Sequence, residues 1–106
     1  MAQHRLIDLA SVIRSKNSGP YELTFDVIFR DFDTYHAVKC AQAIRAEDFS
    51  ALYGIPVSDV LHLVYFDPAK AVKITIRRPL PSGSLGETDV YGAQQHAPLM
   101  GMNIDF

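Results

Sequence analysis

A strictly alternating segment near the N-terminal end constrains the fold most strongly. From residue 21 to residue 30, every second position carries a large apolar side chain, and mostly polar residues lie between. The apolar set is Tyr21, Leu23, Phe25, Val27 and Phe29. A period of two is typical of a β-strand with one buried face, and a slip of one residue would expose the whole set. The sequence therefore predicts a strand of firm register over 21–29.

Two helical segments should follow this strand. Asp31 or Asp33 can cap a helix that begins near Thr34, after which apolar residues recur at helical spacing. Residues 47–53 then form a second helical stretch that ends at Gly54. Glycine accepts the left-handed conformation that commonly closes a helix. We therefore expect two consecutive helices before the next strand.

The other expected strands are less regular. Residues 6–9 form a short apolar run that predicts a buried strand. Residues 60–66 are apolar on both faces except for His62, so we expect a central strand with His62 as a satisfied core histidine. Residues 99–106 alternate again, which predicts a last strand with one apolar face and one polar face.

Residues 67–78 allow two interpretations. Asp67 followed by Pro68 is a specific helix start, because aspartate caps a helix and proline suits its first position. Residues 72–77, however, alternate as a strand would. We follow the start signal and expect a helix that runs to about Arg78. The order of elements then predicts an α+β fold, a two-layer sandwich with helices on one face of a mostly antiparallel sheet.

Size and composition exclude several classes of protein. The 106 residues suit a single domain spanning 1–106, and ten basic against twelve acidic side chains create no basic field for nucleic acid. Cys40 is the sole cysteine, so no internal disulfide is possible and a reducing compartment is expected. No signal-peptide pattern is present, and no apolar run approaches the roughly 20 residues of a membrane helix. We expect a soluble, cytoplasmic protein without a membrane or nucleic-acid partner.

Metal and cofactor chemistry has no sequence signature in this chain. The histidines stand in different expected elements: His4, His36, His62 and His96. No Cys/His pair has the spacing of metal ligands, and the glycine-rich phosphate-loop motif is absent. We expect Cys40 to be a small buried hydrophobic residue rather than a nucleophile. The expectation is no metal and no cofactor.

The first candidate binding segment is the polar run 14–20. Its candidate ligand-binding residues are Arg14, Ser15, Lys16 and Asn17. Guanidinium and ammonium groups, together with turn amides near Gly19, present positive ends that suit an anion. The alternative is an ordinary polar turn between two strands.

The second candidate segment is 82–96, which is too long for a tight turn. Loops longer than about 12 residues in a compact domain are often functional. The candidate proton carriers are His96, Asp89 and Tyr91, and among them His96 titrates near neutrality without help. The candidate ligand contacts are Gly86, Gln94 and Gln95. The alternative is a structural flap that packs against a partner through Tyr91.

Both segments adjoin expected strand ends, so they should meet in one polar pocket. We expect Arg14, Lys16 or Asn17 to lie within reach of the carboxylate, hydroxyl and imidazole groups of 82–96 and to bind an anionic small molecule. The alternative is that Arg14 or Lys16 pairs with Glu87 or Asp89 and locks the flap.

These same two segments resemble a known family. Residues 7–10, which run into 14–22, and residues 86–99 resemble motifs of a family of uncharacterised bacterial proteins of about this length, and the resemblance covers essentially the whole chain. Such proteins are typically encoded beside a large protein of the acyclic terpene utilisation A type. The layout also resembles the C-terminal domain of those large proteins, which is regarded as ferredoxin-like. Arg14 and Ser15 match the start of its Arg-Ser-Gly-Asp-Lys-Gly loop, but its aspartate has no counterpart here.

The resemblance implies a ferredoxin-like fold, a companion subunit and carbon catabolism of an acyl-CoA or a branched carboxylic acid. We therefore expect a small accessory subunit of a two-component enzyme, a lyase, hydratase or isomerase, with polar loops at an inter-subunit site. There are two alternative hypotheses: a non-catalytic assembly module that forms a homo-oligomer, and a stand-alone small-molecule-binding protein.

Overall fold

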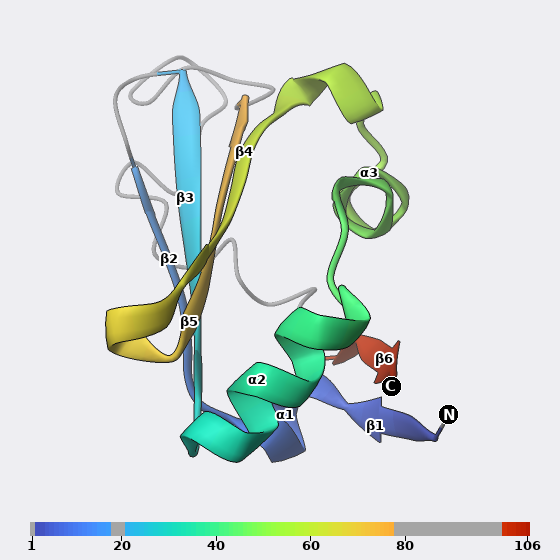
Figure 1. Cartoon of the computed structure of the whole chain (residues 1–106). Coiled ribbons are helices and arrows are strands. Elements are labelled where there is room, and N and C mark those ends of the chain that lie inside the picture. The colour runs from blue at the N-terminus through green and yellow to red at the C-terminus, as the bar shows by residue number, and fades with distance from the viewer. Residues whose placement is uncertain (1, 18–20, 78–100) are drawn as a thin grey trace.

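The computed structural model describes residues 2–17, 21–77 and 101–106. In this part of the chain the strands form one four-stranded sheet and one two-stranded sheet. The four-stranded sheet contains β2 (Ala10–Asn17), β3 (Glu22–Phe29), β4 (Val60–Phe66) and β5 (Ala71–Arg77). Its spatial order is β2-β3-β5-β4, and every neighbouring pair is antiparallel (Figure 1).

The alternating segment forms β3, as predicted. Leu23, Phe25, Val27 and Phe29 are at most 2% exposed and belong to the core. Tyr21 lies just before the strand and is 60% exposed, so the predicted apolar face holds for four of the five residues.

Two helices cover one face of this sheet (Figure 1). They are α2 (Phe32–Ala41) and α3 (Ala46–Tyr53). Asp31 caps α2 by accepting a hydrogen bond from the backbone N–H of Thr34 at 2.7 Å, which confirms the cap expected from the sequence. Gly54 closes α3 with a φ of 64°, again as predicted. We call the face that the helices cover the inner face, and the opposite one the outer face.

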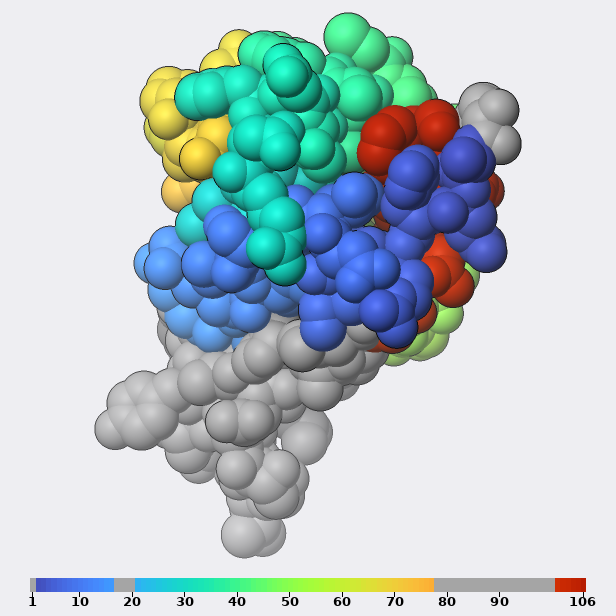
Figure 2. Space-filling view, turned by 90° about the horizontal axis from the view of Figure 1, so that it is seen from below, coloured from blue at the N-terminus to red at the C-terminus, as the bar shows by residue number. Residues whose placement is uncertain are grey.

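The two described ends of the chain lie together (Figure 2). Strand β1 (Gln3–Arg5) pairs with β6 (Asn103–Asp105), and the backbone N–H of Leu6 donates to the carbonyl of Met102 at 2.9 Å. The alternation predicted for the last strand holds where the structure describes it. Met102 and Ile104 are buried, whereas the residues between and beside them are exposed.

Two expectations about the N-terminal part are wrong. Residues 6–9 form a single helical turn, α1 (Leu6–Leu9), instead of a strand. Its first turn is stabilised by an ion pair between Arg5 and Asp8 at 3.0 Å. Residues 14–17 belong to strand β2 instead of a loop. Pairing with β3 satisfies the backbone there whatever the side chains are, and a strand at the side of a sheet tolerates charged residues.

The helix expected over 67–78 is also wrong. The Asp67-Pro68 start signal yields only one 3-10 turn, η2 (Asp67–Ala69), which Lys70 closes with a φ of 52°. The chain then enters β5, which lies between β3 and β4. Burial of the alternating residues 72, 74 and 76 against the core outweighs the local helix signal.

Two smaller expectations fail as well. Strand β4, which follows the turn η1 (Val57–Asp59), ends the four-stranded sheet instead of lying at its centre in the described structure. Its outer face therefore meets solvent, and His62 is exposed instead of buried. Cys40 is also exposed, because it lies on the side of α2 turned away from the sheet core.

The fold class is α+β, with the helices packed as a second layer on the larger sheet, as predicted. The larger sheet and its helices follow the order β2-β3-α2-α3-β4-β5 in the described part of the chain. Among the described residues, no helix is long and apolar enough to cross a membrane.

Replacing Phe25 by alanine should lower the free energy of unfolding by about 3–5 kcal/mol, because it leaves a cavity among aromatic rings. The Phe25 ring centroid lies 5.6 Å from that of Phe49 and 5.1 Å from that of Tyr53. The matched control is Tyr21→Ala, which should change stability by no more than about 0.5 kcal/mol because Tyr21 is exposed. Urea denaturation measures both; equal losses would contradict the described core.

Candidate functional site

The outer face of the four-stranded sheet gathers cations from separate strands. Arg14 and Lys16 alternate with Ser15 along β2, so the two cations lie on the outer face while Ser15 is buried at 6% exposure on the inner one. Arg14 is paired in register with Asp26 of β3, and Asp26 with Lys73 of β5. One row across three strands therefore reads cation, carboxylate, cation.

The next row of the outer face is polar but mostly uncharged. Lys16 is opposite Thr24, Thr24 is opposite Thr75, and Thr75 is opposite His62 of β4. The two threonine hydroxyls lie 3.3 Å apart and share a hydrogen bond. The row thus carries a lysine at one end, two hydroxyls in the middle and an imidazole at the other end.

Sheet geometry keeps the basic groups close together. Neighbouring strands are about 4.8 Å apart, and residues two apart on a strand are about 6.7 Å apart. The backbone positions of Arg14, Lys16 and Lys73 therefore lie within about 12 Å of one another. All three side chains are exposed, which leaves their heads within reach of one ligand.

Asp26 is the buried centre of this arrangement. Its Oδ2 accepts a hydrogen bond from Arg14 Nε at 3.0 Å, and the residue is only 3% exposed. Its Oδ1 is buried and has no hydrogen-bond partner. A buried acceptor without a hydrogen-bond partner is uncommon in proteins.

The charge of the outer face is positive around this carboxylate. Arg14 compensates Asp26 directly, Glu22 lies opposite Arg77 in register, and no ion pair joins Lys16 or Lys73 to another described residue. Lys73 Nζ lies 5.1 Å from the ring centroid of Phe66, and Lys16 has no ion pair within the described ranges. Arg77, farther along β5, pairs with Asp59 at 3.5 Å. Lys16 and Lys73 are therefore the cations available to an added anion.

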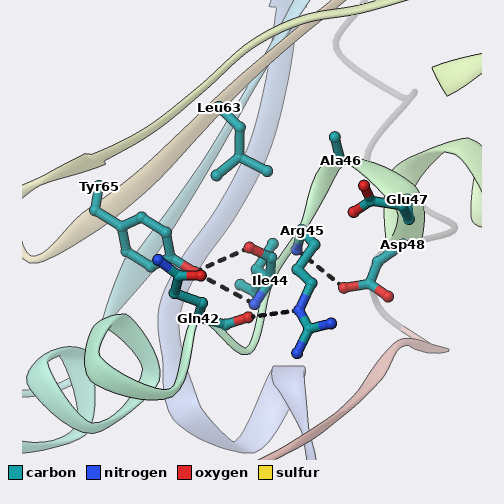
Figure 3. Close-up of a pocket in the computed structure, with 8 residues that line it drawn as sticks. All are labelled: Gln42, Ile44, Arg45, Ala46, Glu47, Asp48, Leu63 and Tyr65. Carbon is teal, nitrogen blue, oxygen red and sulfur yellow. Dashed lines mark hydrogen bonds between the residues drawn. The ribbon is translucent and has the colours of Figure 1, made fainter. Parts of the chain in front are cut away.

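A pocket of about 610 Å³ lies on the other side of the sheet, between β4 and the α2–α3 connection (Figure 3). Leu63, Tyr65 and Ile44 form its apolar wall. The Tyr65 hydroxyl donates to the Ile44 carbonyl at 2.9 Å and accepts from the Ile44 N–H at 3.3 Å. Burial raises the pKa of Tyr65, so this hydroxyl stays protonated and ties the connection to β4.

The polar wall of the same pocket also has structural partners. Asp48 accepts a hydrogen bond from the backbone N–H of Arg45 at 2.9 Å and so caps α3. The Nε of Arg45 donates to the carbonyl of Gln42 at 3.1 Å. These contacts hold the connection in place and bring no acid and base together.

A further polar cluster joins α2 to the turn before β5. The Tyr35 hydroxyl donates to Asp67 at 2.5 Å, and Lys39 Nζ lies 2.8 Å from the same carboxylate oxygen. The hydrogen bond from Lys39, and then that from Tyr35, lower the pKa of Asp67, while burial raises the pKa of Tyr35. Both groups keep their ordinary charge near neutrality, so the cluster acts as a structural link.

The structure brings only some of the predicted site residues together. Arg14 and Lys16 do lie together, whereas Ser15 faces the core and Asn17 ends β2. The other predicted site residues lie outside the described residues: Gly86, Asp89, Tyr91, Gln94, Gln95 and His96. Their expected meeting with β2 therefore stays a prediction. Within the described ranges, no group of three potential metal ligands occurs.

The sequence did not identify Asp26, Lys73, Thr24 or Thr75 as residues of the candidate site. Asp26 occupies a polar position of the alternating β3 segment, and that alternation was the available signal that it faces away from the core. The sequence predicts a helix over 67–78, and in a helix Lys73 would not lie beside Asp26.

The chain belongs to the family described as Domain of unknown function (DUF4387), whose model matches residues 6–103. The match spans all four strands of the larger sheet and is consistent with membership of a small-protein family of this length. No curated protein and no solved structure matches the chain.

Replacing Arg14 by methionine should lower the free energy of unfolding by about 1–3 kcal/mol, because it leaves the buried Asp26 carboxylate without its hydrogen bond. Lys16→Met removes the same charge from the same strand but has no such partner, so its effect should stay within about 0.5 kcal/mol. Urea denaturation of both variants compares them. An Arg14 variant as stable as the Lys16 variant would show that Asp26 does not depend on Arg14.

Proposed function

We propose that this chain is a small accessory subunit of a two-component catabolic enzyme and that its outer sheet face holds an anionic substrate. The observation that carries the proposal is the position of Arg14, Lys16 and Lys73 on neighbouring strands around the buried Asp26 carboxylate. Two cations remain after Arg14 and Asp26 are paired, which suits a carboxylate or a phosphate.

Binding is better supported than self-contained catalysis. The described histidines lie apart: the His4 ring stacks on Phe106 at 4.4 Å, and the His36 ring stacks on Phe32 at 5.9 Å. His62 alone of these three lies on the outer face, at the opposite edge of the sheet from Lys16. A proton carrier close to the bound anion would therefore come from elsewhere, and His96 and Asp89 remain our candidates together with groups of a larger subunit.

The substrate class in this proposal is an acyl-CoA or a branched carboxylic acid. The family resemblance suggests it, together with hydration, dehydration or isomerisation as the reaction and the cytoplasm as the compartment. An acyl-CoA carries several phosphate charges, which would suit cations that lie within about 12 Å of each other on a sheet face. The large partner in the proposal is a protein of the acyclic terpene utilisation A type.

The chain should bind coenzyme A in low-salt buffer, and isothermal titration calorimetry measures the dissociation constant. Lys16→Gln and Lys73→Gln should each raise that constant about tenfold, the factor that corresponds to the loss of about 1.4 kcal/mol. Lys39→Gln is the control, because it removes a positive charge from α2 in the other layer, where Lys39 is paired with Asp67. It should leave the constant unchanged.

Two results would contradict the proposal. One is that neither coenzyme A nor a branched carboxylic acid binds, with the large protein present or absent. The other is that Lys39→Gln weakens binding as much as Lys16→Gln does. Co-purification with the large protein, with activity absent from either chain alone, is the separate test of the accessory role.

A further inference from the structure

Strand β4 has an open edge in the described structure. In the sheet order β2-β3-β5-β4 it has a neighbour on one side, β5, and no described strand pairs with its other side (Figure 1). The backbone N–H and C=O groups of such an edge are free to pair with another strand.

The side chains of β4 do not protect this edge, although the pairing of β4 with β5 is irregular between Val60 and His62. Natural edge strands usually carry a charge or a proline that blocks pairing with another chain. The seven residues of β4 include neither, whereas β2 at the opposite edge carries Arg14 and Lys16. On the outer face of β4, Val64 is 50% exposed and Phe66 is 41% exposed, although both are large apolar residues.

The pocket beside β4 extends this open edge on the inner face. Leu63 and Tyr65 point from β4 toward the α2–α3 connection, and with Ile44 they form the apolar wall of the pocket of about 610 Å³ (Figure 3). A strand added alongside β4 would place its own inner-face side chains at this wall. Main-chain pairing with a pocket for alternate side chains is a recurrent mode of strand recognition.

We propose that β4 pairs antiparallel with β4 of a second copy of this chain, so that two sheets join across a two-fold axis. A second copy suits this edge because β4 contains no Asp, Glu, Lys or Arg, and because Val64 and Phe66 on its outer face are exposed and apolar beside the exposed His62. The same strand can therefore lie opposite itself without opposing like charges, as an isologous interface requires. Leu63 and Tyr65 of each copy then fill the pocket of the other.

This inference goes beyond the proposed function and is independent of it, because the basic residues of the outer face lie on β2 and β5. The experiment measures the molar mass of the full chain by light scattering after size exclusion. The expected mass is twice the 11.8 kDa of the chain. Val64→Lys and Val64→Asp should each give the monomer, because each places like charges near one another across the two-fold axis.

The decisive arm mixes the two variants. Lysine in one copy and aspartate in the other attract across the axis, so an equimolar mixture should recover the dimer mass. The matched control is Val12→Lys, which makes the same change at a 39% exposed valine on the opposite edge strand and should remain dimeric. Circular dichroism checks that each variant is folded. The Asp variant lies opposite Lys73 within the chain, which favours its fold.

Three outcomes would overturn the inference. They are a monomeric wild-type chain at its highest soluble concentration, a dimer that Val12→Lys disrupts while the Val64 variants do not, and a mixture of folded Val64 variants that stays monomeric. The first would show that this edge is not an interface between copies of the chain. None of the three bears on coenzyme A binding, so the two proposals fail separately.

Discussion

The pairing of β3 with strands on both sides is the constraint on which the rest of this structure depends. Because β3 alternates strictly, its register decides at once what enters the core and what faces outward. On the inner face it buries Phe25 and its neighbours beneath the helices. On the outer face the same register sets Asp26 between Arg14 of β2 and Lys73 of β5. The register of β3 thus determines both the burial of its apolar residues and the arrangement of charges on the outer face.

The buried Asp26 carboxylate distinguishes the outer face of the sheet from an ordinary charged surface. A buried carboxylate is unfavourable unless hydrogen bonds compensate its lost hydration. Arg14 compensates one of its oxygens, and the other has no partner. The sheet keeps this group on the outer face of a central strand, with exposed lysines on the strands beside it. That combination favours a binding role for the outer face of the sheet. In the α2–α3 pocket, by contrast, the polar groups described above hydrogen-bond to one another and stabilise the fold.

The sequence predicted the features that depend on local pattern. The β3 strand, the Asp31 cap, the Gly54 helix end and the α+β class all follow from periodicity and turn chemistry. The helix expected after Asp67 did not form, because burial of β5 between two strands outweighed a short-range start signal. Residues 14–17 looked like a loop because they are polar, but backbone pairing at a sheet edge does not require apolar side chains.

The candidate site was also only partly predictable from the sequence. Arg14 and Lys16 were recognisable from composition as cations that suit an anion. Their relation to Asp26 and Lys73 depends on strand register across residues about 12 and 60 positions apart, which a single sequence does not reveal. The edge character of β4 likewise depends on strand order, since an apolar run is typical of both buried and unprotected strands.

Mapping the residues that contact a bound anion tests whether the outer face of the sheet is a binding surface. Amide chemical shifts followed by NMR during titration with coenzyme A give this map without any mutation. We expect the largest changes at the outer-face positions of β2, β3 and β5, centred on Lys16, Asp26 and Lys73. Changes centred instead on Arg45 and the α2–α3 pocket, with the sheet strands unaffected, would contradict it.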